Sequence, residues 1–206
     1  MILLIDLTHP RITVLFDEFV SPVLRIVHSN GHPVRVARIE EIKSIDSACT
    51  GVIVCGTALA DTWYRTRHLT PLLNRWNGPM LGICAGMQML VCETGGEIVP
   101  LSEIGMIPIH ATEQGREDIL IKGKDEFSGY ALHQCTVSLS PQWVSLAVSE
   151  ATVQIAKHLS NPWYGVLFHP EVRNEWIIER FTDYTCSHSR EYERATGMGD
   201  KDMTSG

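Results

Sequence analysis

Short apolar segments alternate with amphipathic ones through the first half of the chain. Four segments predict strands, because they are apolar throughout or alternate apolar with basic positions: 1–7, 34–39, 51–55 and 80–83. Three segments between them predict helices, from helical spacing of apolar residues or from the Gly and Pro residues that close them: 16–30, 69–77 and 85–94. Strands that alternate with helices predict βαβ units and a parallel sheet.

The second half of the chain is richer in strand-like segments. The predicted strands are 106–111, 119–122, 130–139, 144–149, 153–156 and 164–168. A last helix is predicted over 174–185, where Trp176, Ile177, Phe181 and Tyr184 form its apolar side. Together, the two halves predict an α/β fold of three layers, with a mostly parallel central sheet flanked by helices and additional strands in the second half.

Length and composition are those of one ordinary globular domain. The chain has 206 residues, of which 44% are hydrophobic and 20% charged. We expect the domain to span 1–186, and the polar tail 187–206 to be disordered. A net charge of -7 argues against binding nucleic acid through a basic face. Since no apolar run approaches the roughly 20 residues of a membrane helix and no signal peptide is recognisable, we expect a cytoplasmic protein with no membrane partner.

The cysteines predict neither a disulfide framework nor a metal site. The chain has six cysteines, and no two of them form a C-x-x-C pair. A free cysteine is usually a small buried hydrophobic residue. Only Cys84 has neighbours that indicate another role.

Cys84 lies where a predicted strand gives way to a predicted helix. Gly82 and Gly86 leave room for a sharp turn there, which is the geometry of a nucleophile elbow. At a helix N-terminus the macrodipole favours thiolate over thiol, and the N–H of Ala85 is free to point at an oxyanion. The elbow alone fits a catalytic cysteine and a closely packed core cysteine about equally well.

A second motif, His169-Pro170-Glu171, follows the predicted strand 164–168. Residues two apart in an extended chain point to the same side, and Pro170 favours an extended backbone. We therefore expect Glu171 to lie beside the imidazole of His169 and to fix its tautomer. A thiol nucleophile needs such a base and such an orienting carboxylate.

The two motifs together resemble the class I glutamine amidotransferases. That family carries a G-x-C-x-G-x-Q elbow and, well downstream, an H-P-E segment after a strand. In this chain they are Gly82-Ile-Cys84-Ala-Gly86-Met-Gln88 and His169-Pro-Glu171. The resemblance covers nearly the whole ordered chain and implies a flavodoxin-like α/β fold. In length and layout the chain is most similar to the stand-alone glutaminase subunit of archaeal-type GMP synthetases.

The resemblance implies a chemical reaction and a partner. Cys84 would attack the side-chain amide of glutamine, with His169 as base and Glu171 as its orienting group, and a glutamyl thioester would be hydrolysed to glutamate. The ammonia would pass to a separate ATP-using synthetase subunit, with GMP synthesis in purine biosynthesis as the first guess for the acceptor. No P-loop, dinucleotide fingerprint or metal motif is visible, so we expect no cofactor.

The resemblance also assigns substrate-binding residues. Ala85 and the loop Gly56-Thr57 would supply the oxyanion donors, and Gln88 would help to hold glutamine. The backbone of Leu132-His133 would receive the amino-acid end of glutamine. A further match, Glu103-Ile-Gly105, resembles an E-x-G segment of the GMP synthetase branch.

Three departures from the family pattern keep other interpretations open. The oxyanion loop reads Gly56-Thr57-Ala58 where the family has Gly-Gly-Pro or Gly-Gly-Gly, and Thr is a poor occupant if φ must be positive. The opening segment after the first strand and Cys135 also differ from the GMP synthetase branch. The alternatives are a partner-independent γ-glutamyl peptidase of the same fold and a non-catalytic regulatory homologue.

Overall fold

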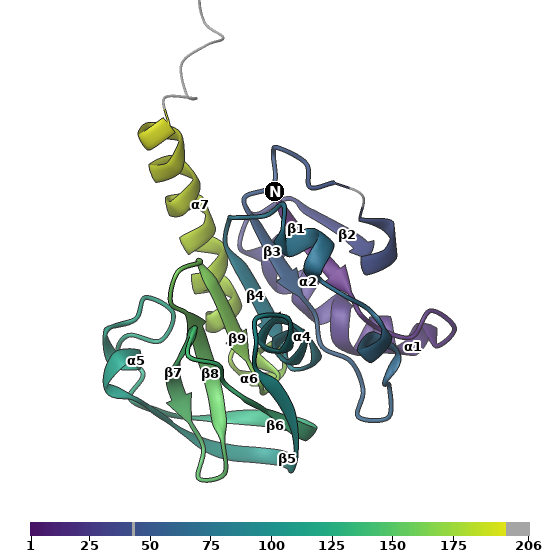
Figure 1. Ribbon diagram of the computed structural model, residues 1–206, viewed down its shortest axis with the longest axis vertical. Coiled ribbons are helices and arrows are strands. Elements are labelled where there is room, and N and C mark those ends of the chain that lie inside the picture. The colour runs from purple at the N-terminus through teal and green to yellow at the C-terminus, as the bar shows by residue number, and fades with distance from the viewer. Residues whose placement is uncertain (43, 197–206) are drawn as a thin grey trace, which may run out of the picture.

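Nine strands form a single mixed sheet in the part of the chain that this computed structural model describes, residues 1–42 and 44–196 (Figure 1). Their order across the sheet is β2-β1-β3-β4-β9-β8-β7-β5-β6. The first five strands in this order are mutually parallel: β2 (Val34–Arg38), β1 (Ile2–Asp6), β3 (Gly51–Val54), β4 (Met80–Ile83) and β9 (Trp163–Val166). The predicted α/β fold with its parallel sheet is therefore confirmed.

The remaining four strands continue the sheet in antiparallel pairs. They are β8 (Val153–His158), β7 (Trp143–Val148), β5 (Glu97–Ala111) and β6 (Glu126–Ser138). β5 and β6 pair along most of their length as a ribbon, which extends along the lower edge of Figure 1. These are the additional strands expected in the second half of the chain.

Helices and helical turns connect the strands. They are α1 (Thr13–Leu15), the π-helical turn Phe16–Val20, α2 (Ser21–Ser29), the 3-10 turns Ile39–Glu41 and Trp63–Thr66, α3 (Thr70–Leu73), α4 (Ala85–Glu93), α5 (Glu113–Glu117), α6 (Pro170–Arg173) and α7 (Trp176–Thr196). Within the described residues, none of these helices is both long and apolar enough to cross a membrane.

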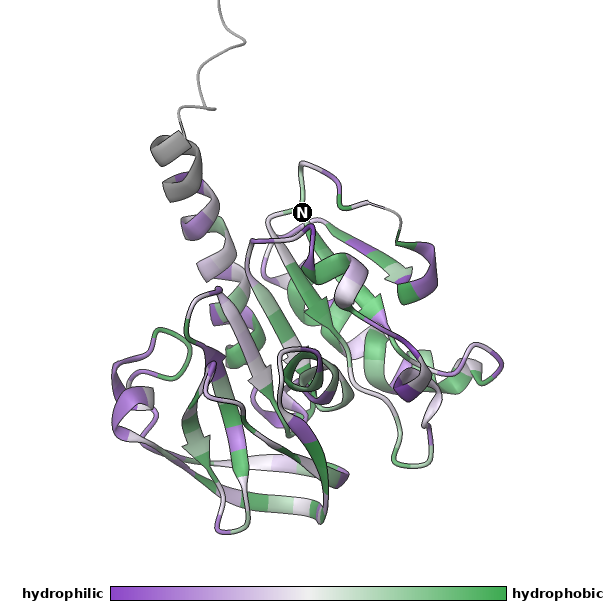
Figure 2. Cartoon of the chain, in the orientation of Figure 1, coloured by the Kyte–Doolittle hydropathy of each residue, from purple (hydrophilic) through white to green (hydrophobic). Residues whose placement is uncertain are grey.

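The parallel strands are covered by helices on both faces. Alternate residues of a strand point to opposite faces, and Ile2 and Leu4 of β1 accordingly join one apolar core while Leu3 and Ile5 join another. The first core also contains residues of α2 and α7, and the second contains residues of α3 and α4. Burial on both faces explains why β1, β3, β4 and β9 are buried at every position. In Figure 2, β1, β3 and β4 are mostly coloured as hydrophobic, whereas β9 is pale over most of its length.

The predicted start of β5 was wrong by nine residues. We expected a strand over 106–111, whereas β5 begins at Glu97. Pro100 lies at an irregularity in the pairing with β6, and Gly105 has a φ of 106°, so both residues interrupt the alternating pattern on which the prediction depended. The predicted strand 130–139 likewise begins earlier, at Glu126.

The segment 119–122 forms turns, although we predicted a strand. Its apolar residues Leu120 and Ile121 are buried in the core, but Asp118 accepts hydrogen bonds from the backbone N–H groups of Leu120, Ile121 and Lys122 and so closes a turn. A short apolar run does not distinguish a strand from a turn that packs inward.

Two helix boundaries also differ from the prediction. The helix expected over 69–77 is only α3, Thr70–Leu73. α7 continues to Thr196, although we expected the helix to end at residue 185 and a disordered tail to follow. The predicted domain boundary at residue 186 therefore falls inside α7, and residues 197–206 lie outside the described part of the chain.

Candidate active site

Cys84 lies at a sharp turn between β4 and α4. Its φ of 48° makes it the one non-glycine residue with positive φ in the described chain. Such a backbone costs on the order of 1–3 kcal/mol and persists only where the surroundings enforce it. Here the N–H of Cys84 donates to the carbonyl of Val166 on β9 at 2.7 Å, and the Cys84 carbonyl accepts from the N–H of Gln88 at 3.0 Å, as the first bond of α4.

The two glycines of the elbow are required by space. A Cβ on Gly82 would lie 2.6 Å from the backbone of Gly86, and a Cβ on Gly86 would overlap the carbonyl oxygen of Val54 on β3. The first turn of α4 therefore packs directly against the ends of two neighbouring strands. Cys84 is held at the carboxyl end of the parallel sheet, where open α/β sheets bind their ligands.

The same edge of the sheet carries the other predicted residues. β3, β4 and β9 are neighbours, so the residues that follow them, Gly56, Cys84 and His169, come together. A Cβ placed on Gly56 would lie 2.9 Å from Cε1 of His169 and 3.4 Å from Cβ of Cys84. The absent side chain of Gly56 thus provides the space that the imidazole and the cysteine share.

His169 and Glu171 form a buried hydrogen bond. Nδ1 of His169 and Oε1 of Glu171 are 2.7 Å apart, and each side chain is 1% exposed. The backbone of His169 is extended, as expected, but Pro170 and Glu171 form the first turn of α6 and do not continue the extended segment. Pro is favoured at this helical position because its missing N–H would have no partner there.

Charge and packing fix the state of His169. Burial disfavours the imidazolium, but the Glu171 carboxylate, together with Cys84, holds the pKa of His169 well above its ordinary value. The ring of Phe19 packs against the imidazole with 5.5 Å between ring centroids. Since Nδ1 faces Glu171 and Nε2 has no hydrogen-bond partner among the described residues, Nε2 is available for chemistry on the Cys84 side.

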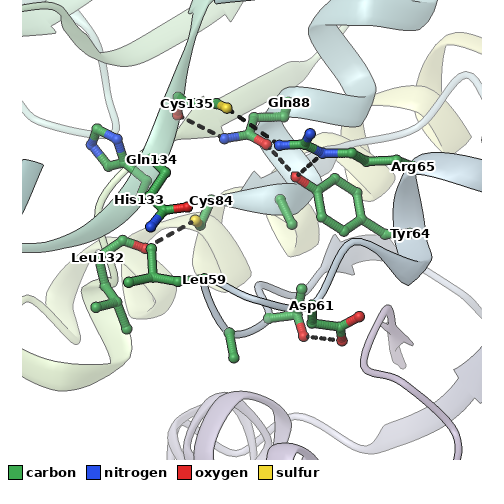
Figure 3. A pocket seen from close by; sticks show the side chains of 13 residues that line it. Leu59, Asp61, Tyr64, Arg65, Cys84, Gln88, Leu132, His133, Gln134 and Cys135 are labelled. Atoms are coloured by element: carbon green, nitrogen blue, oxygen red, sulfur yellow. Dashed lines mark hydrogen bonds between the residues drawn. The ribbon is translucent and has the colours of Figure 1, made fainter. Parts of the chain in front are cut away.

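A small pocket opens at Cys84 (Figure 3). Its volume of about 30 Å3 is far below the several hundred Å3 of ordinary ligand pockets. Five of the six predicted substrate-binding residues line it, and Gly56 does not. The lining residues are Thr57, Ala58, Leu59, Asp61, Tyr64, Arg65, Cys84, Ala85, Gln88, Leu132, His133, Gln134 and Cys135.

Gln88 already has a partner for each end of its amide. Its Oε1 accepts a hydrogen bond from the Tyr64 hydroxyl at 2.5 Å, and its Nε2 donates to the Cys135 carbonyl at 2.8 Å. A ligand that used Gln88 would have to replace one of these bonds. Tyr64 was not identified from the sequence, and Cys135 was identified only as a departure from the GMP synthetase branch.

His133 contributes its backbone to the pocket, while its ring is bound elsewhere. Nδ1 lies 3.4 Å from the carbonyl of Leu101, and Nε2 lies 3.3 Å from Oε2 of Glu103, its partner across the β5–β6 pair. Burial lowers the pKa of His133 despite this carboxylate. Glu103, from the segment that resembles the E-x-G motif, therefore holds β6 in place through His133. The carbonyl of Leu132, the preceding residue of β6, lies 3.9 Å from Sγ of Cys84.

Thr57 has an ordinary φ, so the loop does not demand the glycine that the family carries. Its hydroxyl donates to Oδ2 of Asp61 at 2.6 Å, and Asp61 also accepts the N–H groups of His9 and Trp63. Asp61 thereby joins the loop after β3 to the loop after β1. The Asp61 side chain also accepts from the N–H two residues on, at Trp63, and this Asp-turn is the part of the link that the sequence could have indicated.

The geometry thus defines an α/β protein with a cysteine elbow beside a His–Glu pair. A sequence model of the family described as "Glutamine amidotransferase class-I" matches residues 15–176. The chain belongs to this family.

Several relatives with curated names are GMP synthases or subunits of them. The chain is 38% identical over 104 residues to one subunit of "GMP synthase [glutamine-hydrolyzing]" of Ignicoccus hospitalis, a match over 48% of this chain and 54% of the relative. It is 29% identical over 141 residues to the subunit of the same name from Methanothrix thermoacetophila, over 67% of this chain and 76% of the relative. The matched part spans about half of the first relative and 29% of the GMP synthase of Hahella chejuensis.

Solved structures have the same fold. A Thermoplasma acidophilum protein, provisionally described as a subunit of GMP synthase, superposes with a TM-score of 0.78 at 21% identity and covers 94% of this chain and 96% of that one. A glutamine amidotransferase from Thermotoga maritima has a TM-score of 0.64 at 17% identity, over 97% of this chain and 85% of that one. These likenesses confirm the fold.

Proposed function

We propose that the chain hydrolyses glutamine to glutamate and ammonia, with Cys84 as nucleophile, His169 as acid and base, and Glu171 as the group that orients His169. The observation that carries this proposal is the strained elbow of Cys84 beside a buried His169–Glu171 pair with a free Nε2. Strain of this kind at a cysteine next to an oriented imidazole is expected of an activated nucleophile.

In the proposed reaction, Sγ of Cys84 attacks the side-chain amide carbon of glutamine while His169 holds the thiol proton on Nε2. The backbone N–H groups of Ala85 and Thr57 stabilise the oxyanion. His169 then gives its proton to the leaving nitrogen, and ammonia departs from a glutamyl thioester. A water molecule, deprotonated by His169, adds to the thioester carbon, and glutamate leaves as the thiol of Cys84 is restored.

We further propose that the ammonia is used by a separate synthetase that consumes ATP, as in a GMP synthase built from two chains. The names of the curated relatives support this acceptor. A pocket of about 30 Å3, far smaller than ordinary ligand pockets, also fits a site that opens when such a partner docks. We therefore expect slow hydrolysis by the chain alone and faster hydrolysis with its synthetase.

The test is ammonia release from glutamine by the wild type, Cys84→Ala and Cys92→Ala, each with and without candidate synthetases. Cys92 lies on the same helix but outside the pocket, so it controls for loss of a cysteine. Loss of the nucleophile lowers the rate by at least about 10³-fold, and Cys92→Ala retains it. Equal rates in wild type and Cys84→Ala would refute the proposed mechanism.

A further inference from the structure

Arg65 is the one Arg or Lys among the described residues that line the pocket. Among the lining residues that the structure describes, the ionisable side chains besides the cysteines and Tyr64 are Asp61, Arg65 and His133. Asp61 is an anion that already accepts three hydrogen bonds. The ring of His133 is bound to Leu101 and Glu103, and burial lowers its pKa, which favours the neutral form. An anionic group of a ligand in this pocket therefore has Arg65 as its natural partner.

The guanidinium of Arg65 lies at the end of the pocket marked by Gln88 (Figure 3). Its Nε is 3.4 Å from the Tyr64 hydroxyl that binds Gln88, and its Nη2 is 3.3 Å from Sγ of Cys135. Gln88 follows Cys84 by one turn of α4, and one turn rises about 5.4 Å. Arg65 thus lies beyond the side chain of Gln88, and the backbone of Gln88 is separated from that of the proposed nucleophile by one helical turn.

This separation matches the length of glutamine. Four carbon–carbon bonds of about 1.5 Å join the side-chain amide carbon to the carboxylate carbon, and an extended chain of four such bonds spans about 5 Å. When the amide carbon lies at Sγ of Cys84, the α-carboxylate therefore reaches the Gln88 end of the pocket. This is the end at which Arg65 lies.

The present partners of Arg65 include no carboxylate. Its guanidinium lies 3.4 Å from the Tyr64 hydroxyl, 3.3 Å from the Cys135 thiol and 5.9 Å from the centroid of the Tyr64 ring, and all three groups are neutral. No carboxylate of the described residues lies within 4.0 Å of the Arg65 guanidinium, whereas Arg67, in the same loop, pairs with Glu40 and covers the ring of Trp63. A guanidinium offers five donors in a planar fork that suits a carboxylate.

We propose that Arg65 binds the α-carboxylate of glutamine and so selects substrates that carry a free carboxylate at that end. In the ligand-free pocket, Tyr64 and Cys135 occupy the donors that the carboxylate would take. The inference rests on the proposed glutamine hydrolysis. It adds a charged side chain, Arg65, to the backbone of Leu132-His133, which the family resemblance assigns to the amino-acid end of glutamine.

The test compares two reagents on Arg65→Ala, Arg65→Lys, the control Arg67→Ala and wild type. One reagent is a diazo-ketone analogue of glutamine with its α-carboxylate free, and the other is the α-amide of the same analogue. Mass spectrometry gives the second-order rate constant for the adduct on Cys84 in each variant. Iodoacetamide, which lacks the amino-acid group, measures the intrinsic reactivity of the thiol and reports an intact site.

We expect Arg65→Ala to slow the reaction with the carboxylate-bearing reagent about tenfold, the size of one charge-assisted contact at a partly exposed site. In Arg65→Ala, the rates with the α-amide and with iodoacetamide should change less than about twofold. Arg65→Lys should react with the carboxylate-bearing reagent faster than Arg65→Ala does, and Arg67→Ala should react at the rate of wild type. An equal change for both reagents, or none for either, overturns the role of Arg65. A wild type that, with its synthetase present, reacts with iodoacetamide but not with the analogue refutes the proposed function, and the role of Arg65 with it.

Discussion

Gly56→Ala is expected to disturb the active site without straining the backbone. Gly56 is not among the glycines with positive φ, so alanine is compatible with its backbone. The new methyl would, however, lie 2.9 Å from Cε1 of His169 and 3.5 Å from its Nδ1. Ordinary contacts begin near 3.4 Å, so the imidazole must move by about 0.5 Å. The hydrogen bond to Glu171 opposes this movement.

The size of the effect follows from this displacement. Overpacking of a tight site costs about 1–3 kcal/mol of stability. A misplacement approaching 1 Å costs on the order of 10²-fold in rate, so we expect a loss of roughly 10- to 100-fold for half of that distance. The assays are urea unfolding and the rate at which a glutamine-like diazo-ketone modifies Cys84.

A matched control separates crowding from backbone strain. Gly123 has a φ of 77°, and nothing lies within 4 Å of the position that a methyl group would take there. Gly123→Ala should therefore lower stability by about 1 kcal/mol and leave the modification rate of Cys84 unchanged. If Gly56→Ala reacts as fast as wild type, the imidazole does not occupy the space beside Gly56, and the described geometry of the site is wrong.

Two further changes test the groups that hold the site. Glu171→Gln should lower the pKa of His169, measured by NMR titration, because burial then outweighs the remaining charges. In wild type the raised pKa of His169 contributes stability that is fully present below the unfolded-state pKa of about 6.5 and is lost as pH rises through the folded-state pKa. The difference in free energy of unfolding between wild type and Glu171→Gln should therefore shrink at high pH. A difference that does not change with pH would contradict this expectation. Asp61→Ala leaves the Thr57 hydroxyl and two backbone N–H groups without their acceptor and should cost about 2–4 kcal/mol in urea unfolding; a change below about 0.5 kcal/mol would show that water replaces the carboxylate.

Much of the candidate site could be predicted because it depends on short segments at neighbouring strand ends. The elbow at Cys84 and the His169–Glu171 pair are each local motifs, and parallel strands bring their carboxyl ends to one edge of a sheet. The parallel half of the fold was equally accessible, since strands buried on both faces are apolar throughout. The pair formed with His169 extended, as predicted, although Pro170 and Glu171 begin a helical turn.

The residues that the sequence did not indicate are joined by contacts between distant segments. Tyr64 meets Gln88 across 24 positions, and Arg65 meets Cys135 across 70. Only the packing of the loop after β3 against β6 brings them to the pocket, and no periodicity or spacing encodes that packing. Length and polarity misled the predictions elsewhere: α7 extends to Thr196 although its last turns are polar.

The most direct measurement is peptide mapping of the chain after reaction with the glutamine-like diazo-ketone. Two cysteines line the pocket, Cys84 and Cys135, so the position of the adduct identifies the nucleophile. We predict a single adduct on Cys84, none on Cys135, and none in His169→Ala. An adduct on Cys135 alone, or an unmodified chain in the presence of its synthetase, would contradict the assignment of Cys84 as the nucleophile that hydrolyses glutamine.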